Sequence, residues 1–445
     1  MKEKVLVVGG GGREHAIVTA LVRSDAEVYA VMKNKNPGIV RAAKDHALIK
    51  ETDVEKVVSY ARSKGIELAI IGPEAPLEAG LTDALRKDGV GCVGPSRSAA
   101  RLETSKSYAR ELMERNNIPG NLRFRTFVEA APAKKYIDEI DHEVAVKPVG
   151  LTGGKGVKVQ GEHLLTKSDV KAYIDEVFEK RIGGAGVVLE EKAIGEEFTM
   201  QAFCDGKTLV PMPLVQDHKR AYEGDVGPNT GGMGSYTDAD HLLPFVKRYE
   251  RDEAESILQK VVSAMSKEGS PYQGIIYGQF MLTKDGPKVI EFNARFGDPE
   301  AMNVLTILSS NFTDVAWSIA DGYLNANKVS FLNKATVCKY VVPQGYGTTP
   351  RSGLPIKVNE SAIHELGAEA YFAAVDEIDG KILTGTSRSV GVVGVADTID
   401  GAERICESAL RYVEGEALYV RHDIGTKELV EKRVSHMNLI RGGAR

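Results

Sequence analysis

Three polar side chains stand at two-residue intervals in GPKVIEFNARFGDPE, the stretch from Gly286 to Glu300. Glu291 and Asn293 interrupt an apolar strand pattern, and Arg295 follows them. Alternate residues of a strand share a face, so Glu291 and Asn293 point together from Cα atoms about 7 Å apart. Their oxygens suit a hard cation such as Mg²⁺ or Mn²⁺, and the guanidinium of Arg295 suits a carboxylate or a phosphate. An ion pair with Asp298 is the alternative for this arginine.

The turn before this strand predicts a third oxygen ligand. The preceding apolar run, GIIYGQFMLT, reaches the strand through KDG, which suits a three-residue hairpin loop with its glycine in the left-handed conformation. In that register Gln279 lies opposite Glu291 on the same face, whereas a two-residue loop would place Phe280 opposite Glu291. We therefore predict a metal site formed by Gln279, Glu291 and Asn293, with Glu291 able to bridge two ions. A buried polar network without metal is the alternative.

A glycine-rich turn near the N-terminus predicts an anion site. VVGGGGREHA ends a strand and opens a helix, where backbone N–H groups and the helix dipole favour a phosphate. A dinucleotide site is disfavoured, because Glu14 or His15 stands where the third required glycine belongs and the second strand ends in Lys33 rather than an acid. We expect a monophosphate or sugar phosphate here, with Glu74 of the strand end IGPE on a ribose hydroxyl. A turn without a ligand is the alternative.

Charged side chains surround a second glycine-rich loop, GLTGGKG, residues 150–156. It is not a P-loop, because Lys155 is followed by glycine rather than serine or threonine. A lid over phosphates and a solvated hairpin tip are both compatible with it. Lys147 lies in the apolar strand VAVKP, where an ammonium needs an anionic partner. Glu190 and Glu197 flank a turn, where their carboxylates suit the amine and ribose edges of a nucleotide. A surface acidic loop is the alternative.

Length and strand rhythm predict an α/β protein of about three domains. A chain of 445 residues exceeds one compact core. Over residues 1–103, short apolar strands alternate with helical stretches, the pattern of a parallel sheet. Residues 104–328 hold antiparallel strand pairs, α+β in character, with a lid over about 119–188. Residues 329–445 form a small α/β unit that opens on KATVCKYVVPQGYG.

Composition disfavours several classes of function. The net charge is −5, with 42% hydrophobic and 27% charged residues, so no global positive field recruits nucleic acid or an anionic membrane. The sequence has no run of about 18 apolar residues, and its start lacks the pattern of a signal peptide. The four cysteines lie far apart and are typical of reduced thiols. We expect a cytoplasmic protein without a nucleic-acid or membrane partner, as a monomer or weak dimer.

The order of these motifs resembles an ATP-grasp fold, with Lys106, Lys147, GLTGGKG, LEEKAIGEE and VIEFN in sequence. GGGGREHA, GPEAPL, QDHKR, GPNTGGMG and EFNARFGDPE are more specifically similar to the phosphoribosylamine–glycine ligase family, and the similarity extends to RHDIG, Arg421–Gly425. The resemblance implies an N-terminal parallel-sheet domain, a central ATP-grasp domain with a glycine-rich lid, and a small C-terminal α/β domain. Val149 and the segments KNPG and TSR depart from the family pattern.

The resemblance implies an ATP-dependent ligation in purine biosynthesis. Glycine carboxylate attacks the γ-phosphate of ATP, and the amine of 5-phosphoribosylamine then displaces phosphate from glycyl phosphate to give glycinamide ribonucleotide. Lys147, Asp217 and Arg295 are expected to act on the reacting groups. The implied nucleotide contacts are Lys106, Lys147, Gly153, Gly154, Lys155, Gly156, Glu190, Ala193 and Glu197. The implied substrate contacts are Gly10, Gly11, Gly12, Arg13, Glu14, His15 and Glu74 for phosphoribosylamine, and Asp217, Asn229, Thr230 and Arg295 for glycine and its acyl phosphate.

Three alternative functions remain open at this point. They are another ATP-grasp ligase of purine synthesis or a biotin-dependent carboxylase, an NAD-dependent oxidoreductase, and a nucleotide sensor without catalysis. GPNTGGMG and NARFGDPE disfavour the first, and the glycine spacing disfavours the second. The lysines and the predicted metal ligands disfavour the third.

Overall fold

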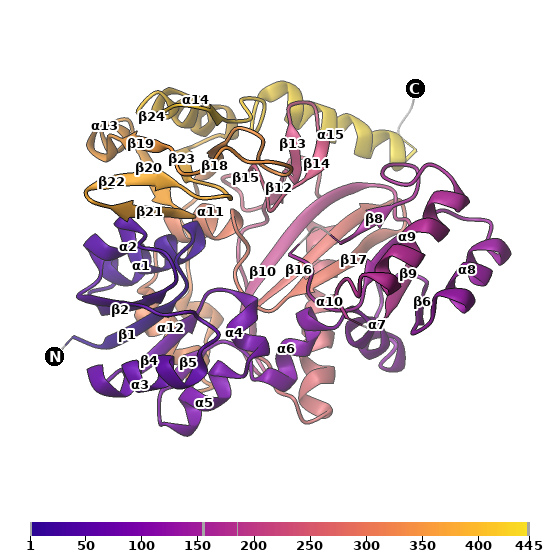
Figure 1. The fold of residues 1–445 in the computed structure, drawn as a ribbon, viewed down its shortest axis with the longest axis horizontal. Helices are drawn as coiled ribbons and strands as arrows, with labels where there is room; N and C mark the ends of the chain where they lie inside the picture. The colour runs from indigo at the N-terminus through magenta and orange to yellow at the C-terminus, as the bar shows by residue number, and fades with distance from the viewer. Residues whose placement is uncertain (1, 154–155, 185, 443–445) are drawn as a thin grey trace.

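The computed structural model describes residues 2–153, 156–184 and 186–442. In Figure 1 the N-terminal domain (indigo) and the C-terminal domain (orange) lie together at one side of the molecule, and the lid (purple) lies at the other. The long antiparallel strands of the central domain run between them. The predicted three-part α/β architecture, with a parallel sheet first, is confirmed.

The N-terminal domain is a parallel sheet of five strands in the order β3-β2-β1-β4-β5. The central strands β1 and β4 are apolar runs, KVLVV and LAII, and helices alternate with the strands, which is the pattern of a sheet covered on both faces. The strand order reverses between β1 and β4, which is where open sheets bind ligands. The strands are β1 (Lys4–Val8), β2 (Glu27–Met32), β3 (Asp45–Leu48), β4 (Leu68–Ile71) and β5 (Gly91–Val93). The helices are α1 (Gly12–Arg23), α2 (Pro37–Ala42), α3 (Val54–Lys64), α4 (Glu74–Glu78) and α5 (Leu81–Lys87).

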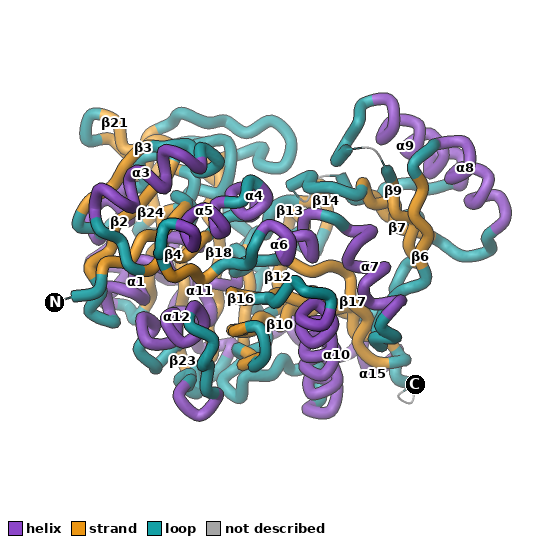
Figure 2. Tube along the Cα trace, turned by 90° about the horizontal axis from the view of Figure 1, so that it is seen from below, coloured by secondary structure: helices purple, strands orange, loops and turns teal. Residues whose placement is uncertain are grey.

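Two antiparallel sheets form the central domain. The lid sheet, β6-β9-β7-β8, carries two helices and encloses a hydrophobic core of its own; Figure 2 shows it projecting from the rest of the molecule. The second sheet, β11-β10-β16-β17, packs against the long helix α10. The lid elements are β6 (Phe124–Phe127), α8 (Ala130–Glu139), β7 (Val144–Pro148), β8 (Lys158–Val159), α9 (Lys167–Glu179) and β9 (Val187–Glu191). The others are α6 (Arg97–Thr104), α7 (Lys106–Arg115), β10 (Glu196–Asp205), β11 (Leu209–Pro211), α10 (Arg248–Lys267), β16 (Gln273–Thr283) and β17 (Gly286–Asn293).

The hairpin β16–β17 has a shorter loop than the sequence predicted, but it places Gln279 opposite Glu291 as expected. Thr283 pairs with Gly286, so the loop is two residues long rather than three, although Gly286 does adopt the left-handed conformation with φ +84°. The register then shifts between Gln279 and Phe280, which leaves Ile290 unpaired in a β-bulge. Because the bulge adds one residue to β17, Gln279 lies opposite Glu291 as predicted.

The main sheet of the C-terminal domain takes in strands from the central segment. It has the order β12-β15-β18-β23-β20, so β12 and β15 join it from well before residue 329. Its elements are β12 (Gln216–Asp217), β15 (Gly234–Thr237), β18 (Ala335–Pro343), β19 (Pro355–Val358), α13 (Glu360–Glu365), β20 (Ala368–Phe372), β21 (Val375–Ile378), β22 (Lys381–Thr384), β23 (Val390–Ala396), α14 (Ile399–Leu410), β24 (Val413–Gly415) and β25 (Leu418–Tyr419). The remaining elements are β13 (Arg220–Tyr222), β14 (Val226–Asn229), α11 (Glu300–Thr306), α12 (Phe312–Ala320), η1 (Ala326–Lys328) and α15 (Lys427–Ile440).

Helix α15 leaves the C-terminal domain and returns over the central one (Figure 1). Arg441, at its end, forms three hydrogen bonds of 2.6–3.0 Å with the carboxylate of Glu250 on α10. The helix thereby joins the last segment of the chain to the domain that holds the central strands. Among the described helices, none is both long enough and apolar enough to cross a membrane.

Candidate active site

A cavity of about 1380 Å³ lies where the domains and the lid meet. Its walls come from the carboxyl edge of the N-terminal sheet, helices α6 and α7, the lid, strands β16 and β17, and helix α15. The volume exceeds the roughly 300–1,000 Å³ of a usual single-ligand pocket, so the cavity has room for more than one ligand. The predicted residues that line it are Arg13, Glu74, Lys106, Lys147, Gly153, Glu190, Ala193, Glu197, Asp217, Asn229, Thr230, Gln279, Glu291, Asn293 and Arg295.

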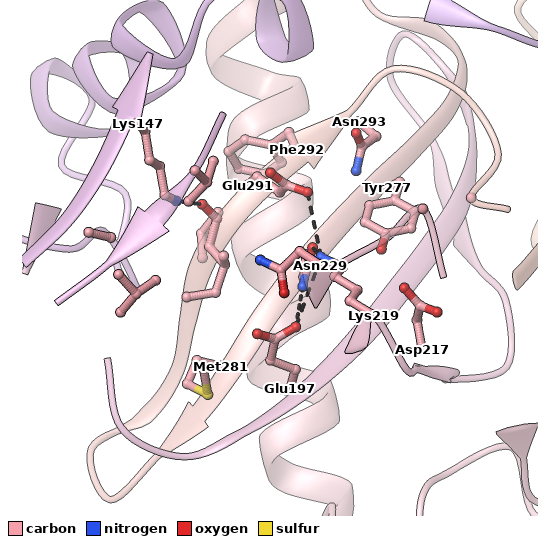
Figure 3. A pocket seen from close by; sticks show the side chains of 18 of the residues that line it. Lys147, Glu197, Asp217, Lys219, Asn229, Tyr277, Met281, Glu291, Phe292 and Asn293 are labelled. Atoms are coloured by element: carbon pink, nitrogen blue, oxygen red, sulfur yellow. Dashed lines mark hydrogen bonds and ion pairs between the residues drawn. The ribbon is translucent and has the colours of Figure 1, made fainter. Parts of the chain in front are cut away.

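Lys219 places its ammonium among oxygen atoms on the floor of the cavity (Figure 3). Its Nζ donates to Gln279 Oε1 at 2.5 Å and lies 3.8 Å from Glu291 Oε1 and 4.0 Å from Glu197 Oε2. Burial alone would lower the pKa of Lys219, but Glu197 and Glu291 raise it. Two carboxylates and an amide oxygen therefore already stabilise one cation, and the same donors fit a hard ion such as Mg²⁺.

The predicted metal ligands do not all face this point. Burial opposes ionisation of Glu291, yet Lys219 and then Lys147 hold the pKa of its carboxyl below the usual value. Asn293 shares the strand face of Glu291, but its Oδ1 accepts a hydrogen bond of 3.1 Å from Arg295. Gln279 and Glu291 thus surround the cation position, while the amide of Asn293 is held by the arginine. No cluster of three or more His, Cys, Asp or Glu side chains elsewhere in the described chain competes as a metal site.

Lys147 has the anionic partner that its buried position required. Its Nζ lies 2.8 Å from Glu190 Oε2 and donates to the carbonyl of Ile290 at 2.7 Å. Arg110 of α7 holds both oxygens of Glu190, at 2.8 and 2.7 Å. Burial would raise the pKa of Glu190, but Arg110 and Lys147 lower it to about 2. The three side chains form one buried charge network that joins α7, the lid strands and β17.

Lys106 and the glycine-rich loop lie beside this network. Lys106 Nζ donates to the carbonyl of Gly150 at 3.0 Å, and burial together with Lys147 lowers its pKa. Gly153 has φ +58°, in the left-handed region, and the carbonyl of Gly156 accepts from Tyr173 at 2.7 Å. Gly154 and Lys155, both predicted to cover phosphates, lie outside the described residues.

Arg295 pairs with Glu103 of α6 and approaches Glu74 of α4 rather than pairing with Asp298. Its Nη2 lies 3.1 Å from Glu103 Oε1, and its Nε lies 3.6 Å from Glu74 Oε2. Asp298 instead pairs with Arg388 at 3.2 Å and accepts from the hydroxyl of Tyr340 at 2.5 Å. The alternative of an Arg295–Asp298 ion pair is therefore wrong.

Three of the residues predicted near glycine lie at the ends of two short strands, Asp217 in β12, Asn229 in β14 and Thr230 directly after it. Asp217 Oδ1 accepts from the backbone N–H of His218 at 2.7 Å. Burial, followed by the nearby Glu300, raises the pKa of Asp217. Thr230 donates its hydroxyl to the carbonyl of Lys219 at 2.8 Å, and Asn229 ends the short strand β14. The arrangement places a carboxyl group, an amide and a hydroxyl beside the cation cluster.

Comparison with known families divides the chain into three segments. Models of the phosphoribosylglycinamide synthetase N domain, ATP-grasp (A) domain and C domain match residues 3–103, 104–301 and 336–427. Phosphoribosylamine–glycine ligase of Pyrococcus horikoshii is 54% identical over 98% of this chain and 97% of its own length. That of Methanothermobacter thermautotrophicus is 53% identical over 98% of this chain and its whole length. The chain belongs to the phosphoribosylamine–glycine ligase family. It is an ATP-dependent ligase.

Solved structures agree with the phosphoribosylamine–glycine ligase family in fold. The crystal structure of phosphoribosylamine–glycine ligase from Thermotoga maritima has a TM-score of 0.81 at 27% identity, covering 94% of this chain and 99% of that one. A biotin carboxylase domain from Hydrogenobacter thermophilus, solved with MgADP and bicarbonate, has a TM-score of 0.73 at 17% identity, covering 100% of this chain and 96% of that one. At 17% identity the second likeness is one of fold alone and does not support a carboxylase. The family models and the relatives at 53–54% identity support the ligase over the oxidoreductase and sensor alternatives.

In the N-terminal glycine-rich turn, the side chain of Glu14 bonds to neighbouring residues of the turn itself. The carboxylate of Glu14 accepts from the N–H of Gly11 at 2.7 Å and pairs with Arg13 Nε at 2.6 Å. A Cβ on Gly72 would lie 2.1 Å from Glu14 Oε1, so the carboxylate fills the space between the two strand ends. Of the residues predicted in this turn, all of them described, only Arg13 lines the cavity; Gly10, Gly11, Gly12, Glu14 and His15 do not.

His15 joins domains instead of facing the cavity. Its Nδ1 accepts from the backbone N–H of Phe372 in the C-terminal domain at 2.9 Å. Burial, and then Arg41, lowers the pKa of His15 to about 3. Asn36 of the segment KNPG adds to the same junction, because its amide donates to the carbonyls of Gly10 and Phe372 at 3.0 and 2.8 Å. His15 and Asn36 thus have structural contacts between the N-terminal and C-terminal domains, and a substrate contact of His15 stays a prediction.

Three nucleotide contacts were predicted at and after the end of β9: the side chains of Glu190 and Glu197 and the backbone near Ala193. Both oxygens of Glu190 accept from Arg110 and Lys147, which hold its carboxylate in the buried charge network, and a contact with adenine stays a prediction. Ala193 lines the cavity and leaves its backbone as the group available to a base. Glu197 lies beside Lys219 and accepts from Gln279, so it borders the cation cluster as well as the predicted ribose site.

Sequence reasoning missed several residues of the site, among them Arg110, Lys219 and Glu103. Lys219 stands two residues after Asp217 in QDHKR, and attention to that alternation would have found it. Glu103 lies at the end of α6, and nothing in the helical pattern of RSAARLET distinguishes it from a surface acid. Its contact with Arg295 joins positions 192 residues apart in the chain, so only the folded structure reveals it.

Proposed function

We propose that this chain ligates glycine to 5-phosphoribosylamine with ATP, giving glycinamide ribonucleotide, ADP and phosphate in de novo purine biosynthesis. The observation that carries the proposal is a single cavity that holds the buried lysines, the oxygen cluster around Lys219, and Arg295. Phosphoryl transfer depends mainly on positioning and on neutralising charge, and these groups are suited to both. The family relatives at 52–54% identity carry the names that indicate these substrates.

Each group has a proposed role in the reaction. Lys106 and Lys147 neutralise the phosphates of ATP, with Gly153–Gly156 covering them. Arg295 binds the carboxylate of glycine and then the glycyl phosphate bidentately. The acyl phosphate loses phosphate when the amine of phosphoribosylamine attacks its carbonyl carbon. Mg²⁺, when bound, would neutralise the transferring phosphate; Gln279 and Glu291 would hold it, with Asn293 next to them on the same strand face. The remaining contacts are Asp217, Asn229 and Thr230 for glycine, Arg13 and Glu74 for phosphoribosylamine, and the backbone of Ala193 and the side chain of Glu197 for the nucleoside.

ADP release tests the proposal directly. Purified protein is mixed with Mg²⁺, ATP, glycine and freshly formed phosphoribosylamine, and each component is omitted in turn. We expect equal amounts of ADP and glycinamide ribonucleotide from the complete mixture, and their loss when glycine is omitted or when EDTA is added. ADP release without glycine, or no turnover with every component present, would refute the assignment. A monomer or weak dimer in the cytoplasm stays a prediction, which light scattering and cell fractionation test.

A further inference from the structure

The direction of the Arg295 guanidinium is set by groups outside its own strand. Nη2 lies 3.1 Å from Glu103 Oε1 and donates to Asn293 Oδ1 at 3.1 Å. Nη1 donates to the carbonyl of Phe296 at 3.1 Å. The buried Nε finds no hydrogen-bond partner among the described residues, because Glu74 approaches it only to 3.6 Å. Both terminal nitrogens of the guanidinium are therefore held by neighbouring groups, and Nε is the buried donor left without a hydrogen-bond partner in the described part of the chain.

Glu103 holds both the backbone and the side chain at this point. It lies in the last turn of α6 with 7% of its surface exposed. Its Oε2 accepts from the backbone N–H of Ala294 at 2.7 Å, and its Oε1 faces Arg295. A single carboxylate thus fixes the position of the strand end and the orientation of the next side chain.

The buried surroundings of Glu103 disfavour an ionised carboxylate, so a contribution to fold stability does not by itself explain why a glutamate stands here. Burial, opposed by Arg295 and reinforced by Glu74, raises its pKa to about 7. The cost of desolvating a buried ion pair often cancels the attraction between its charges. Two apolar side chains of similar size in place of Glu103 and Arg295 would therefore stabilise the fold equally well. Glu74, by contrast, is 29% exposed and farther from the arginine. The two acids differ in the way expected of a fixed support and a group open to a ligand.

We propose that Glu103 is a positioning residue that aims the guanidinium of Arg295 at the carboxylate of glycine and at the acyl phosphate formed from it. The inference rests on the proposed function, because it assigns a support to an arginine already placed in that reaction. Glu103 makes no contact with substrate in this scheme. It acts by holding the fork, since the bidentate recognition of a carboxylate or phosphate depends on the orientation of both N–H groups.

Glu103→Gln tests the proposal, because glutamine keeps an oxygen for the N–H of Ala294 and removes the charge that faces Arg295. We expect kcat to fall by about 100-fold, the order reported for small misplacements of a catalytic group. The KM for ATP should stay close to the parental value, whereas the urea midpoint should fall because a buried ion pair loses one partner. A fall in kcat at unchanged KM for ATP separates positioning from a general structural role. A parental kcat, or a loss of kcat accompanied by an equal rise in the KM for ATP, would overturn the proposal.

Glu250→Gln is the matched control. Glu250 is also buried and holds Arg441 through both oxygens, yet it lies outside the cavity lining. This variant should lose stability and keep kcat. If Glu103→Gln does not fold, Glu103→Asp retains the charge and shortens the side chain by one methylene, and the same loss of kcat at unchanged KM for ATP is expected. A parental kcat for Glu103→Asp would then refute the proposal.

A double-mutant cycle with Arg295→Met tests whether Glu103 acts through the arginine. ADP release is followed with radiolabelled ATP over hours, so that slow turnover is measured. In the Arg295→Met background, Glu103→Gln should lower kcat no further, because the group that it positions is absent. Additive losses would overturn the proposal. Failure of the parental chain to form glycinamide ribonucleotide would refute the proposed function instead, so the two failures are distinguishable.

Discussion

Arg110→Met removes one member of the buried charge network that supports Lys147. Arg110 makes five hydrogen bonds, two to Glu190 at 2.8 and 2.7 Å and three to Asn121, Val289 and Ile290 at 3.1, 2.9 and 3.1 Å. Its side chain and that of Glu190 are 4% and 2% exposed. Methionine keeps most of the apolar stem, and among the described residues it leaves Lys147 as the one cation paired with Glu190.

The expected cost of this substitution follows from burial. Removing one partner of a buried ion pair destabilises a protein by about 3–5 kcal/mol, because the other charge stays desolvated. With a urea slope of about 3 kcal/mol per M, the unfolding midpoint of the central domain should fall by about 1–1.7 M. The KM for ATP should also rise, because Lys147 must then neutralise Glu190 alone and is less available to phosphates.

Arg115→Met provides the comparison, because this arginine lies on the same helix. Arg115 pairs with both oxygens of Glu268 at 2.8 and 2.6 Å, but its side chain is 41% exposed. Exposed pairs contribute about 0–1 kcal/mol, so its midpoint should scarcely change and its KM for ATP should stay parental. Equal midpoint shifts in the two variants, or no shift for Arg110→Met, would refute the argument from burial.

Three further substitutions follow from single contacts. Glu291→Gln should abolish ADP release while leaving the urea midpoint near the parental value, because it removes a charged oxygen beside Lys219; near-normal turnover would exclude a metal role for Glu291. Gly195→Ala should lower the melting temperature, because its Cβ would lie 1.8 Å from the carbonyl oxygen of Leu282 and overpacking costs about 1–3 kcal/mol or more. An unchanged melting temperature would contradict this close approach of the chain. The parental protein should lose stability as pH falls below 6.5 towards 3, by up to about 1.4 kcal/mol per unit from His15, since the unfolded state binds a proton there that the folded imidazole does not. Urea midpoints measured against pH should show a shallower fall in His15→Gln, and identical slopes would contradict the buried, neutral histidine.

Local rules of chain geometry were enough to predict much of the fold. Alternating apolar strands and helices predicted the parallel N-terminal sheet, because each βα unit is recognised within about 30 residues. The period of two along β17 placed Glu291 and Asn293 on one face. The left-handed glycine at Gly286 was also predictable from the turn sequence.

The hairpin β16–β17 shows where local rules become insufficient. The predicted pair of Gln279 and Glu291 is present, although the expected loop length was wrong. A β-bulge at Ile290 restores the register, and the carbonyl of Ile290 accepts hydrogen bonds from Lys147 and Arg110. Those donors come from β7 and α7, more than a hundred residues earlier in the chain, so no reading of the hairpin alone could include them.

The sequence by itself determined which residue types were present, which faces of each strand they share and which ligand chemistry they suit. Tertiary structure decided which charges meet. It turned Glu14 and His15 inward, bound Glu190 to Arg110, and brought Glu103 to Arg295. The physical reason is that a carboxylate or an ammonium takes the partner that folding brings nearest in a medium of low dielectric, and such partners are seldom neighbours along the chain.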